Sequence, residues 1–265
     1  MITNKIELDT EKSSSENDSE KKVHPWRLCP SGKHYVRTHD EHVKLSKTHP
    51  NGETVVRHAH CANNPSHKDM LSFDEIHAIT EKYFSNLTGT PTAGILIKYG
   101  QTDAHFLKAD DYDYLIRGWV YYWNTIFKPI NPLDPNLIKA LMATESSFNE
   151  KSNNIVLNKN KKIHARGLLQ ITEETWHVLG NHHGELHNYL IELKESDLFD
   201  PSANIYGGIR WLFRKKEIAS TRLKREATWE EAIIDYKSYR GAINKNKPVP
   251  ALNHLRDYYN QLQGK

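Results

Sequence analysis

Four helix-start signals constrain the fold of this chain more than any other feature of its sequence. Asp134-Pro135 and Asp200-Pro201 each place a capping carboxylate before a proline, which favours the first position of a helix. Ser72-Phe-Asp-Glu75 and Thr228-Trp-Glu-Glu231 have the spacing of a capping box. Because apolar residues follow each signal at helical spacing, we predict an α-rich domain from about residue 70 onward.

The segments before this domain differ from it in composition and in hydrophobic periodicity. Residues 1–22 are rich in Ser, Glu, Lys and Asn and lack periodicity, which predicts a disordered tail. The β-like segments 34–37 and 54–57 are consistent with two paired strands, and Asn51-Gly52 between them is a hairpin signal. We therefore expect a mainly α fold in four parts: a tail at 1–22, a small His/Cys-rich β module at 23–70, a linking helix and loop at 71–110, and a helical domain at 111–265.

The charge balance limits the classes of partner. Lys and Arg number 36 against 33 Asp and Glu, and a net charge of +3 argues against a nucleic-acid-binding surface. No apolar run approaches the ~18 residues of a membrane span, so we expect no membrane insertion. The first residues lack the apolar core of a signal peptide, which predicts synthesis in the cytoplasm without a Sec signal.

Glu145 is the candidate catalytic carboxylate. It shares a predicted helix face with Ile138, Leu141 and Met142, near the C-terminal end of that helix. Desolvation and the negative end of the helix dipole both raise the pKa of a carboxyl group at such a position. Glu145 could therefore stay protonated near neutral pH and serve as a general acid, although a lone glutamate at the rim of a core is the ordinary alternative.

Three ordered motifs around Glu145 resemble those of the soluble lytic transglycosylases. The motifs are Ala143-Thr-Glu-Ser-Ser-Phe-Asn149, Ala165-Arg-Gly-Leu-Leu-Gln170, and Asp200-Pro-Ser-Ala-Asn-Ile205 followed by Gly208 and Trp211-Leu212. The resemblance spans about residues 115–245, half of the chain. It implies a lysozyme-like α fold for the helical domain, with a groove that binds sugars.

The resemblance also carries roles to particular residues. Glu145 matches the catalytic acid/base, and Ser146 matches the adjacent hydroxyl that supports it. Gly167 and Gln170 match the groove wall, and Asn204 matches a structural position.

The fourth motif of the family, Ala-Tyr-Asn-Ala-Gly, is degenerate in this chain. Tyr236 is retained and is our candidate for a hydroxyl that points at Glu145 or the substrate. Lys237 stands where the family has Asn, which puts the usual amide contact in doubt. A solvated lysine is the ordinary expectation at such a position, and a contact with an anionic peptide stem is the alternative.

The reaction implied by the resemblance is cleavage of the MurNAc-GlcNAc β-1,4 bond in peptidoglycan with a 1,6-anhydro product. Residues 151–172, which should face Glu145 across the groove, contain no Asp or Glu, in agreement with a one-carboxylate route. Asp197, Asp200 and Asp235 could still approach in space. A hydrolytic muramidase and a catalytically silent wall-binding module are therefore the alternatives.

The partners expected from this function are peptidoglycan glycan strands. Catalysis needs no cofactor by this reading. If its target lies outside the cell, the protein acts in the periplasm or cell wall after non-Sec export or lysis, with a secretion machine or an immunity protein as further partners.

Histidines and both cysteines gather in the β module. Eight of the 16 His residues lie between His24 and His67, together with Cys29 and Cys61. Cys29, His34, His60 and Cys61 could bind a structural zinc ion, which would stabilise a module with little apolar content. A Cys29–Cys61 disulfide is the competing prediction, and free thiols with surface histidines are the third.

Overall fold

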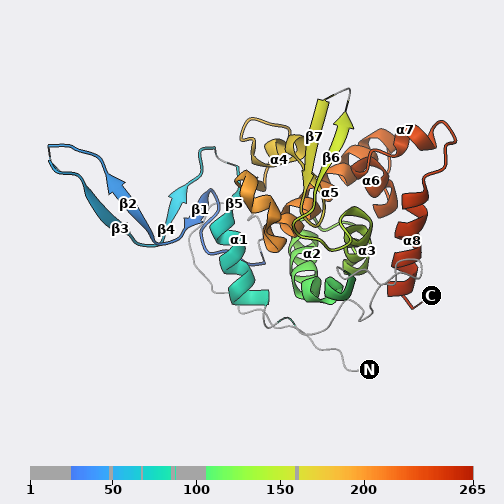
Figure 1. Ribbon diagram of the computed structural model, residues 1–265, viewed down its shortest axis with the longest axis horizontal. Helices are drawn as coiled ribbons and strands as arrows, with labels where there is room; N and C mark the ends of the chain where they lie inside the picture. The colour runs from blue at the N-terminus through green and yellow to red at the C-terminus, as the bar shows by residue number, and fades with distance from the viewer. Residues whose placement is uncertain are drawn as a thin grey trace.

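The computed structural model describes residues 25–47, 50–66, 68–84, 87, 106–158 and 161–264. A helical body makes up most of the molecule, and two β-hairpins project from it in different directions (Figure 1). The predicted mainly α fold is confirmed, whereas the tail predicted at residues 1–22 lies outside the described residues. None of the described helices is both long and apolar enough to cross a bilayer.

The described helices are α1 (Phe73–Ile79), α2 (Asp113–Phe127), α3 (Pro135–Glu145), α4 (Glu173–Gly180), α5 (Pro201–Leu223), α6 (Trp229–Tyr236), α7 (Arg240–Ile243) and α8 (Pro250–Leu262), with a π-helix at Thr80–Phe84 and 3-10 helices at Phe106–Tyr112 and Glu195–Phe199. Helices α1, α3, α5 and α6 begin at the four sequence signals. Asp134 caps α3, Asp200 caps α5, and Thr228 forms a capping box at α6. Ser72 accepts a hydrogen bond from the amide of Glu75 at the start of α1.

Helix α3 runs through the core of the body. Residues 136–143 are all buried, including Lys139, whose side chain is fully shielded from solvent. The Lys139 ammonium pairs with Asp110 and lies 2.9 Å from Asp113, so its buried charge is compensated. At the other end of the chain, the Tyr259 hydroxyl of α8 donates to the α3 cap Asp134 at 2.8 Å. The position of the C-terminal end of α3, where Glu145 lies, is therefore set by core packing.

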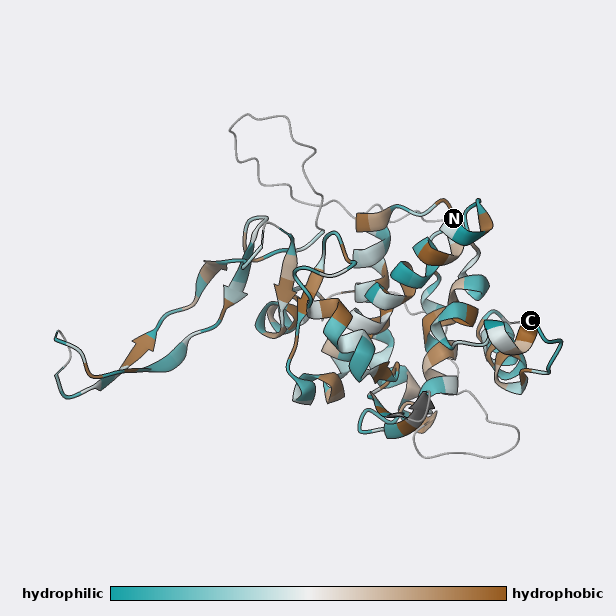
Figure 2. Ribbon diagram, turned by 90° about the horizontal axis from the view of Figure 1, so that it is seen from above, coloured by the Kyte–Doolittle hydropathy of each residue, from teal (hydrophilic) through white to brown (hydrophobic). Residues whose placement is uncertain are grey.

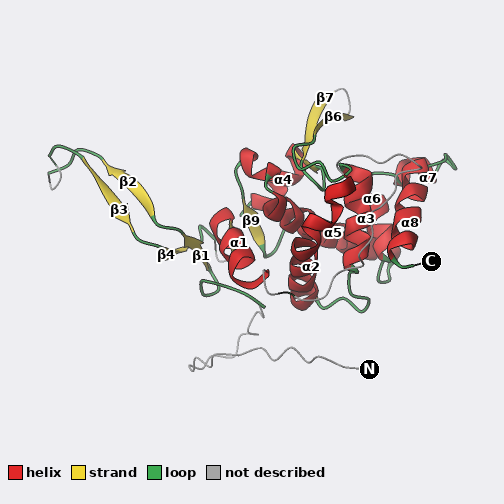
Figure 3. Cartoon of the chain, turned by 60° about the horizontal axis from the view of Figure 1, so that its bottom comes forward, coloured by secondary structure: helices red, strands yellow, loops and turns green. Residues whose placement is uncertain are grey.

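The first hairpin is a long two-stranded arm, which lies apart from the helices in Figure 3. Strand β1 (Lys33–Val36) pairs with β4 (His60–Asn63), and β2 (His39–Val43) pairs with β3 (Glu53–Arg57), all antiparallel. The prediction that segments 34–37 and 54–57 pair with each other is wrong, because each pairs with a polar, histidine-containing strand that lacks an obvious β pattern. The arm is mostly hydrophilic and exposed (Figure 2), so it adds little to the core.

A disulfide closes the base of the arm. Cys29 and Cys61 are bonded to each other, with their Cα atoms 5.7 Å apart. The proposed zinc site is therefore corrected: both thiolate ligands are consumed by the disulfide, which was the competing prediction. The two remaining candidates have other partners, since His34 Nδ1 lies 2.9 Å from Asn64 Oδ1 and His60 Nδ1 donates to the carbonyl of His58. No group of metal-binding side chains is found in the described part of the chain.

Two buried carboxylates attach the base of the arm to the body. Glu75, which is fully buried in α1, accepts hydrogen bonds from the amides of Leu28 at 3.3 Å and Tyr35 at 3.1 Å. Asp69 accepts from the guanidinium of Arg27 at 2.9 Å. The capping-box reading of Glu75 misses this role, because the carboxylate binds a segment some 40 residues earlier in the chain.

The remaining strands connect the helices of the body. Strand β5 (Met70–Ser72) pairs in parallel with β9 (Leu190–Glu192), which brings the segment before α1 into the same core as the later helices. Strands β6 (Asn153–Asn158), β7 (Lys161–Arg166) and β8 (Ile171–Thr172) form a three-stranded antiparallel sheet, of which β6 and β7 make the second projecting hairpin. The sequence predicts a loop here, since its lysines and asparagines hide any alternation of apolar residues.

We predict that Glu75→Gln loosens the arm. The amide keeps one acceptor oxygen but loses the charge that two backbone amides and the nearby Arg27 compensate, which should cost about 2–4 kcal/mol locally. Hydrogen–deuterium exchange should therefore speed up in residues 33–36 and 60–63, while α3 and α5 stay protected. Glu192→Gln, at an exposed position of β9, is the control. Unchanged protection of the arm in Glu75→Gln would contradict this role.

Candidate active site

Glu145 is the last residue of α3 and is largely shielded from solvent. Its side chain is 14% exposed, and residues 138, 141 and 142 on the same helix face are buried in the core. The sequence prediction that this carboxylate lies against an apolar face is therefore matched by its burial. A carboxyl group at such a position loses most of its hydration, which disfavours its charged form.

Lys237 is the charged partner of Glu145. It follows α6, its side chain is 7% exposed, and its ammonium Nζ lies 2.9 Å from Glu145 Oε1. The same ammonium lies 3.3 Å from Thr144 Oγ1 and 3.5 Å from the Thr144 carbonyl oxygen. A cation at the C-terminal end of a helix also interacts favourably with the helix dipole. The residue that departs from the family pattern thus contacts the candidate acid directly.

Two opposing effects set the pKa of Glu145. Burial raises this pKa above its ordinary value, and the charge and hydrogen bond of Lys237 lower it. Burial is the larger effect, so the pKa of Glu145 remains raised overall. The raised pKa agrees in direction with the expectation, but the sequence predicts Lys237 against the substrate or in solvent and not beside Glu145.

A tight turn at residues 167–170 gathers the other predicted site residues. The Ser146 hydroxyl donates to the Leu168 carbonyl at 2.8 Å, and the Tyr236 hydroxyl donates to the Leu169 carbonyl at 2.6 Å. The Gln170 side-chain amide donates to the carbonyl of Gly167 at 2.8 Å. Tyr236, expected to point its hydroxyl at Glu145 or the substrate, and Ser146, expected to support Glu145, thus both donate to the backbone of this turn.

The turn itself is held by a buried amide of α5. Asn204 is fully buried, accepts from the Leu169 amide at 2.8 Å, and donates to the carbonyls of Arg166 at 2.9 Å and Leu198 at 2.7 Å. Gly167 has a φ of +74°, and a Cβ atom there would lie 2.2 Å from Asn204 Nδ2. Only glycine fits this position, because both the backbone conformation and the space exclude a side chain. Asn204 occupies the structural position expected of it.

The backbone after Glu145 adopts an uncommon conformation. Ser147 has a φ of +52° and Phe148 a φ of +62°, although neither is glycine. The buried Phe148 ring packs edge-on against Phe106, with ring centroids 5.3 Å apart, which holds this conformation in place. Left-handed residues outside glycine cost free energy and cluster at functional sites, which agrees with the placement of Glu145.

Sequence reasoning missed three residues of the site. Thr144 contacts Lys237 with both its hydroxyl and its carbonyl, and Asn154 of β6 donates to the side-chain oxygen of Gln170 at 2.9 Å. The Tyr239 ring centroid lies 5.7 Å from the Lys237 ammonium. Thr144 lies inside the quoted motif, so it could have been identified, whereas Asn154 depends on a hairpin that the sequence does not predict.

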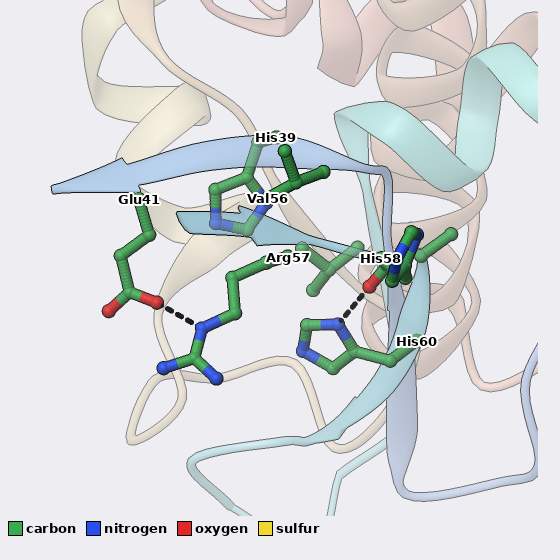
Figure 4. A pocket seen from close by; sticks show the side chains of 8 residues that line it. His39, Glu41, Val56, Arg57, His58 and His60 are labelled. Carbon is green, nitrogen blue, oxygen red and sulfur yellow. Dashed lines mark hydrogen bonds and ion pairs between the residues drawn. The ribbon is translucent and has the colours of Figure 1, made fainter. Parts of the chain in front are cut away.

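A hollow lies on the arm, and none of the residues above lines it. It has a volume of about 600 Å³ and lies where β1 and β4 give way to β2 and β3; it is lined by Val36, His39, Glu41, Val56, Arg57, His58, Ala59 and His60. Figure 4 shows the ion pair of Glu41 with Arg57 across this hollow and the hydrogen bond from the His60 ring to the His58 carbonyl. His39, His58 and His60 therefore share an open surface of the arm.

The helical body places a shielded glutamate at the end of a core helix, as expected for a lysozyme-like domain. Residues 128–249, slightly less than half of the chain, match the family model of the transglycosylase SLT domain, so this part of the chain is similar to that family. The family consists of lytic transglycosylases that act on peptidoglycan in the cell wall or periplasm. Comparison with curated proteins and with solved structures gives no match.

Gly167→Ala should destabilise the protein. The new Cβ would meet Asn204 and the Leu198 carbonyl while the backbone is held at positive φ, at a cost of about 2–4 kcal/mol. Gly241→Ala is the matched control, because nothing lies within 4 Å of its Cβ position and alanine suits a helix. Thermal unfolding should show a lower Tm for the first variant only. Equal Tm values would contradict the close approach at Gly167.

Lys237→Met should raise the pKa of Glu145. The substitution removes the positive charge that lowers this pKa and leaves the larger effect of burial unopposed. Carboxyl-carbon NMR titration of the two proteins would measure the change, and Lys245→Met, at an exposed position outside the site, is the control. A lower or unchanged pKa in Lys237→Met would mean that the ion pair does not govern Glu145.

Proposed function

We propose that this protein is a peptidoglycan lytic transglycosylase in which Glu145 is the single acid/base. The bond cleaved is the β-1,4 linkage from N-acetylmuramic acid to N-acetylglucosamine, and the product carries a 1,6-anhydromuramyl end. The observation that carries the proposal is the carboxyl group of Glu145, buried at the end of a core helix inside the region that matches the SLT domain.

The partners of the other carboxylates support a one-carboxylate route. Asp197 accepts from the amide of Lys194 at 2.7 Å, and Asp200 caps α5 while lying 3.1 Å from His77 Nε2. Asp235 is paired with Arg222 at 2.7 Å. Each of the three acids that could have served as a second catalytic carboxylate thus has a structural partner. Hydrolytic glycosidases ordinarily need a second carboxylate to attack or to activate water.

The mechanism follows from one group that acts twice. Glu145 donates its proton to the glycosidic oxygen, and the bond from that oxygen to C1 of the muramyl sugar breaks. The carbonyl oxygen of the sugar's own acetamido group stabilises the positive charge that develops at C1. The Glu145 carboxylate then removes the proton of the C6 hydroxyl, and O6 bonds to C1. Glu145 ends the cycle protonated, and no water is added.

Groups around Glu145 would favour the first step. The raised pKa of Glu145 keeps more of it protonated at a given pH than a solvated glutamate. Ser146 and Tyr236 fix the turn at residues 167–170 against α3 and α6, so the wall beside the acid is rigid before substrate binds. Catalysis by this route requires no metal or cofactor.

Glu145→Gln should abolish cleavage of purified sacculi while leaving the fold intact. The amide has nearly the same shape but cannot donate the acid proton, and a loss of at least about 100-fold in rate is expected. Glu174→Gln, at an exposed position of α4, should digest sacculi at the wild-type rate. Cleavage by Glu145→Gln at the wild-type rate would remove the central assignment.

Mass spectrometry of the same digests identifies the reaction. Anhydromuramyl ends are about 18 Da lighter than hydrolysed ends, because no water enters the product. Reducing muramyl ends alone would instead identify a muramidase. Intact sacculi after incubation with the folded wild-type protein would identify a catalytically silent wall-binding module.

A further inference from the structure

The position of Lys237 indicates a role in substrate recognition, which rests on the proposed function. Its side chain is 7% exposed and its ammonium lies 2.9 Å from Glu145 Oε1, so the pair is not an incidental surface contact. Thr144 holds the ammonium from a second side, with its hydroxyl at 3.3 Å. The chain thus places a fixed positive charge beside its acid, at a position where the family pattern has a neutral amide.

This pairing opposes the first chemical step. A cation 2.9 Å away favours the carboxylate form of Glu145, whereas a general acid must carry a proton when the glycosidic bond breaks. The opposition disappears if the ammonium turns to a different anion once substrate is bound. Lysine suits such a movement, because its charge is compact and its four-carbon stem is flexible.

The substrate offers such an anion on one of its two sugars. N-acetylmuramic acid carries a lactyl ether on C3, and that substituent ends in a free carboxylate or continues into a peptide that bears carboxylates. N-acetylglucosamine has no charged group. The charge therefore marks the sugar whose C1 must react, and it lies within the same repeat as the bond that Glu145 would cleave.

We propose that Lys237 recognises this carboxylate of the muramyl sugar. When a strand binds, the ammonium leaves Glu145 Oε1 for a carboxylate on the lactyl substituent of the muramyl sugar, and Glu145 takes up a proton from solvent that it then donates to the glycosidic oxygen. Thr144 and the ring of Tyr239, whose centroid is 5.7 Å from the ammonium, line the path of the lysine. Recognition of an anionic substrate is thereby coupled to the protonation of the acid.

Three glycan strands of equal length test the proposal. The first keeps its peptide stems, the second is stripped by an amidase so that the lactyl carboxylate is free, and the third is stripped and then has its carboxylates converted to primary amides. The wild-type protein should form anhydromuramyl ends from the third strand about tenfold more slowly than from the better of the other two, mainly through kcat. The faster of the two anionic strands identifies which carboxylate is used.

Lys237→Asn is the matched variant, since it restores the amide of the family pattern. Its rates on the three strands should agree within about twofold, because no cation then holds Glu145 in its charged form. Circular dichroism and Tm check that the variant is folded. The pH profile of the wild-type protein gives a second test. On the neutral strand Lys237 stays beside Glu145 and favours its charged form, so activity should be lost at a lower pH than on an anionic strand.

The outcomes separate this proposal from the proposed function. Equal wild-type rates and equal pH profiles on all three strands would overturn the reading of charge by Lys237, and so would an unchanged tenfold preference in folded Lys237→Asn. In both cases the anhydro product would still support the proposed function. Absence of anhydromuramyl ends from every strand with the wild-type protein would overturn the proposed function itself.

Discussion

The hydrogen bonds of one buried side chain, Asn204, hold the site together. This amide of α5 binds the Arg166 carbonyl before the turn at residues 167–170, the Leu169 amide within the turn and the carbonyl of Leu198, so it joins α5 and the segment before it to a turn more than 30 residues earlier in the chain. Ser146 and Tyr236 then attach α3 and α6 to the same turn. An unpaired amide in this position would be costly, which makes the arrangement close to all-or-none. The distance from Glu145 to Lys237 depends on this turn, because Glu145 ends α3 and Lys237 directly follows α6.

The environment of Glu145 balances burial of its carboxyl group against pairing with a lysine. Complete burial of a carboxylate without a partner would cost several kcal/mol, and complete exposure would leave its pKa near the ordinary value. Glu145 lies between these limits, shielded by the core residues of α3 and paired with the lysine that follows α6. Lys237 offsets only part of the free energy that burial of the Glu145 carboxylate costs. The buried apolar residues of α3 stabilise the fold enough to tolerate the remaining cost.

Local signals in the sequence predict the helices well, and non-local contacts explain the errors. The caps at Asp134, Asp200 and Thr228 act within a few residues, so they can be identified without knowledge of the fold. Pairing of strands in the arm depends on contacts across the hairpin that periodicity does not encode. Glu75 shows the same limit, since its capping-box spacing conceals a carboxylate that binds a distant segment. The motif around Glu145 singles out this candidate acid from sequence alone, but its contact with Lys237 depends on the ends of two helices that meet only in the fold.

The hairpin of β6 and β7 occupies the chain between Glu145 and the turn at residues 167–170, and its base is closed on both sides. The Gly167 amide donates to the carbonyl of Ser152 at 2.8 Å, and Asn153 pairs with Arg166 just beyond. Once these ends are joined, the number of residues in the projecting part changes the entropy of the loop only slowly. Insertions or deletions at the tip would therefore leave the acid and its wall in register. A change in the length or charge of this hairpin is therefore compatible with an unchanged position of Glu145.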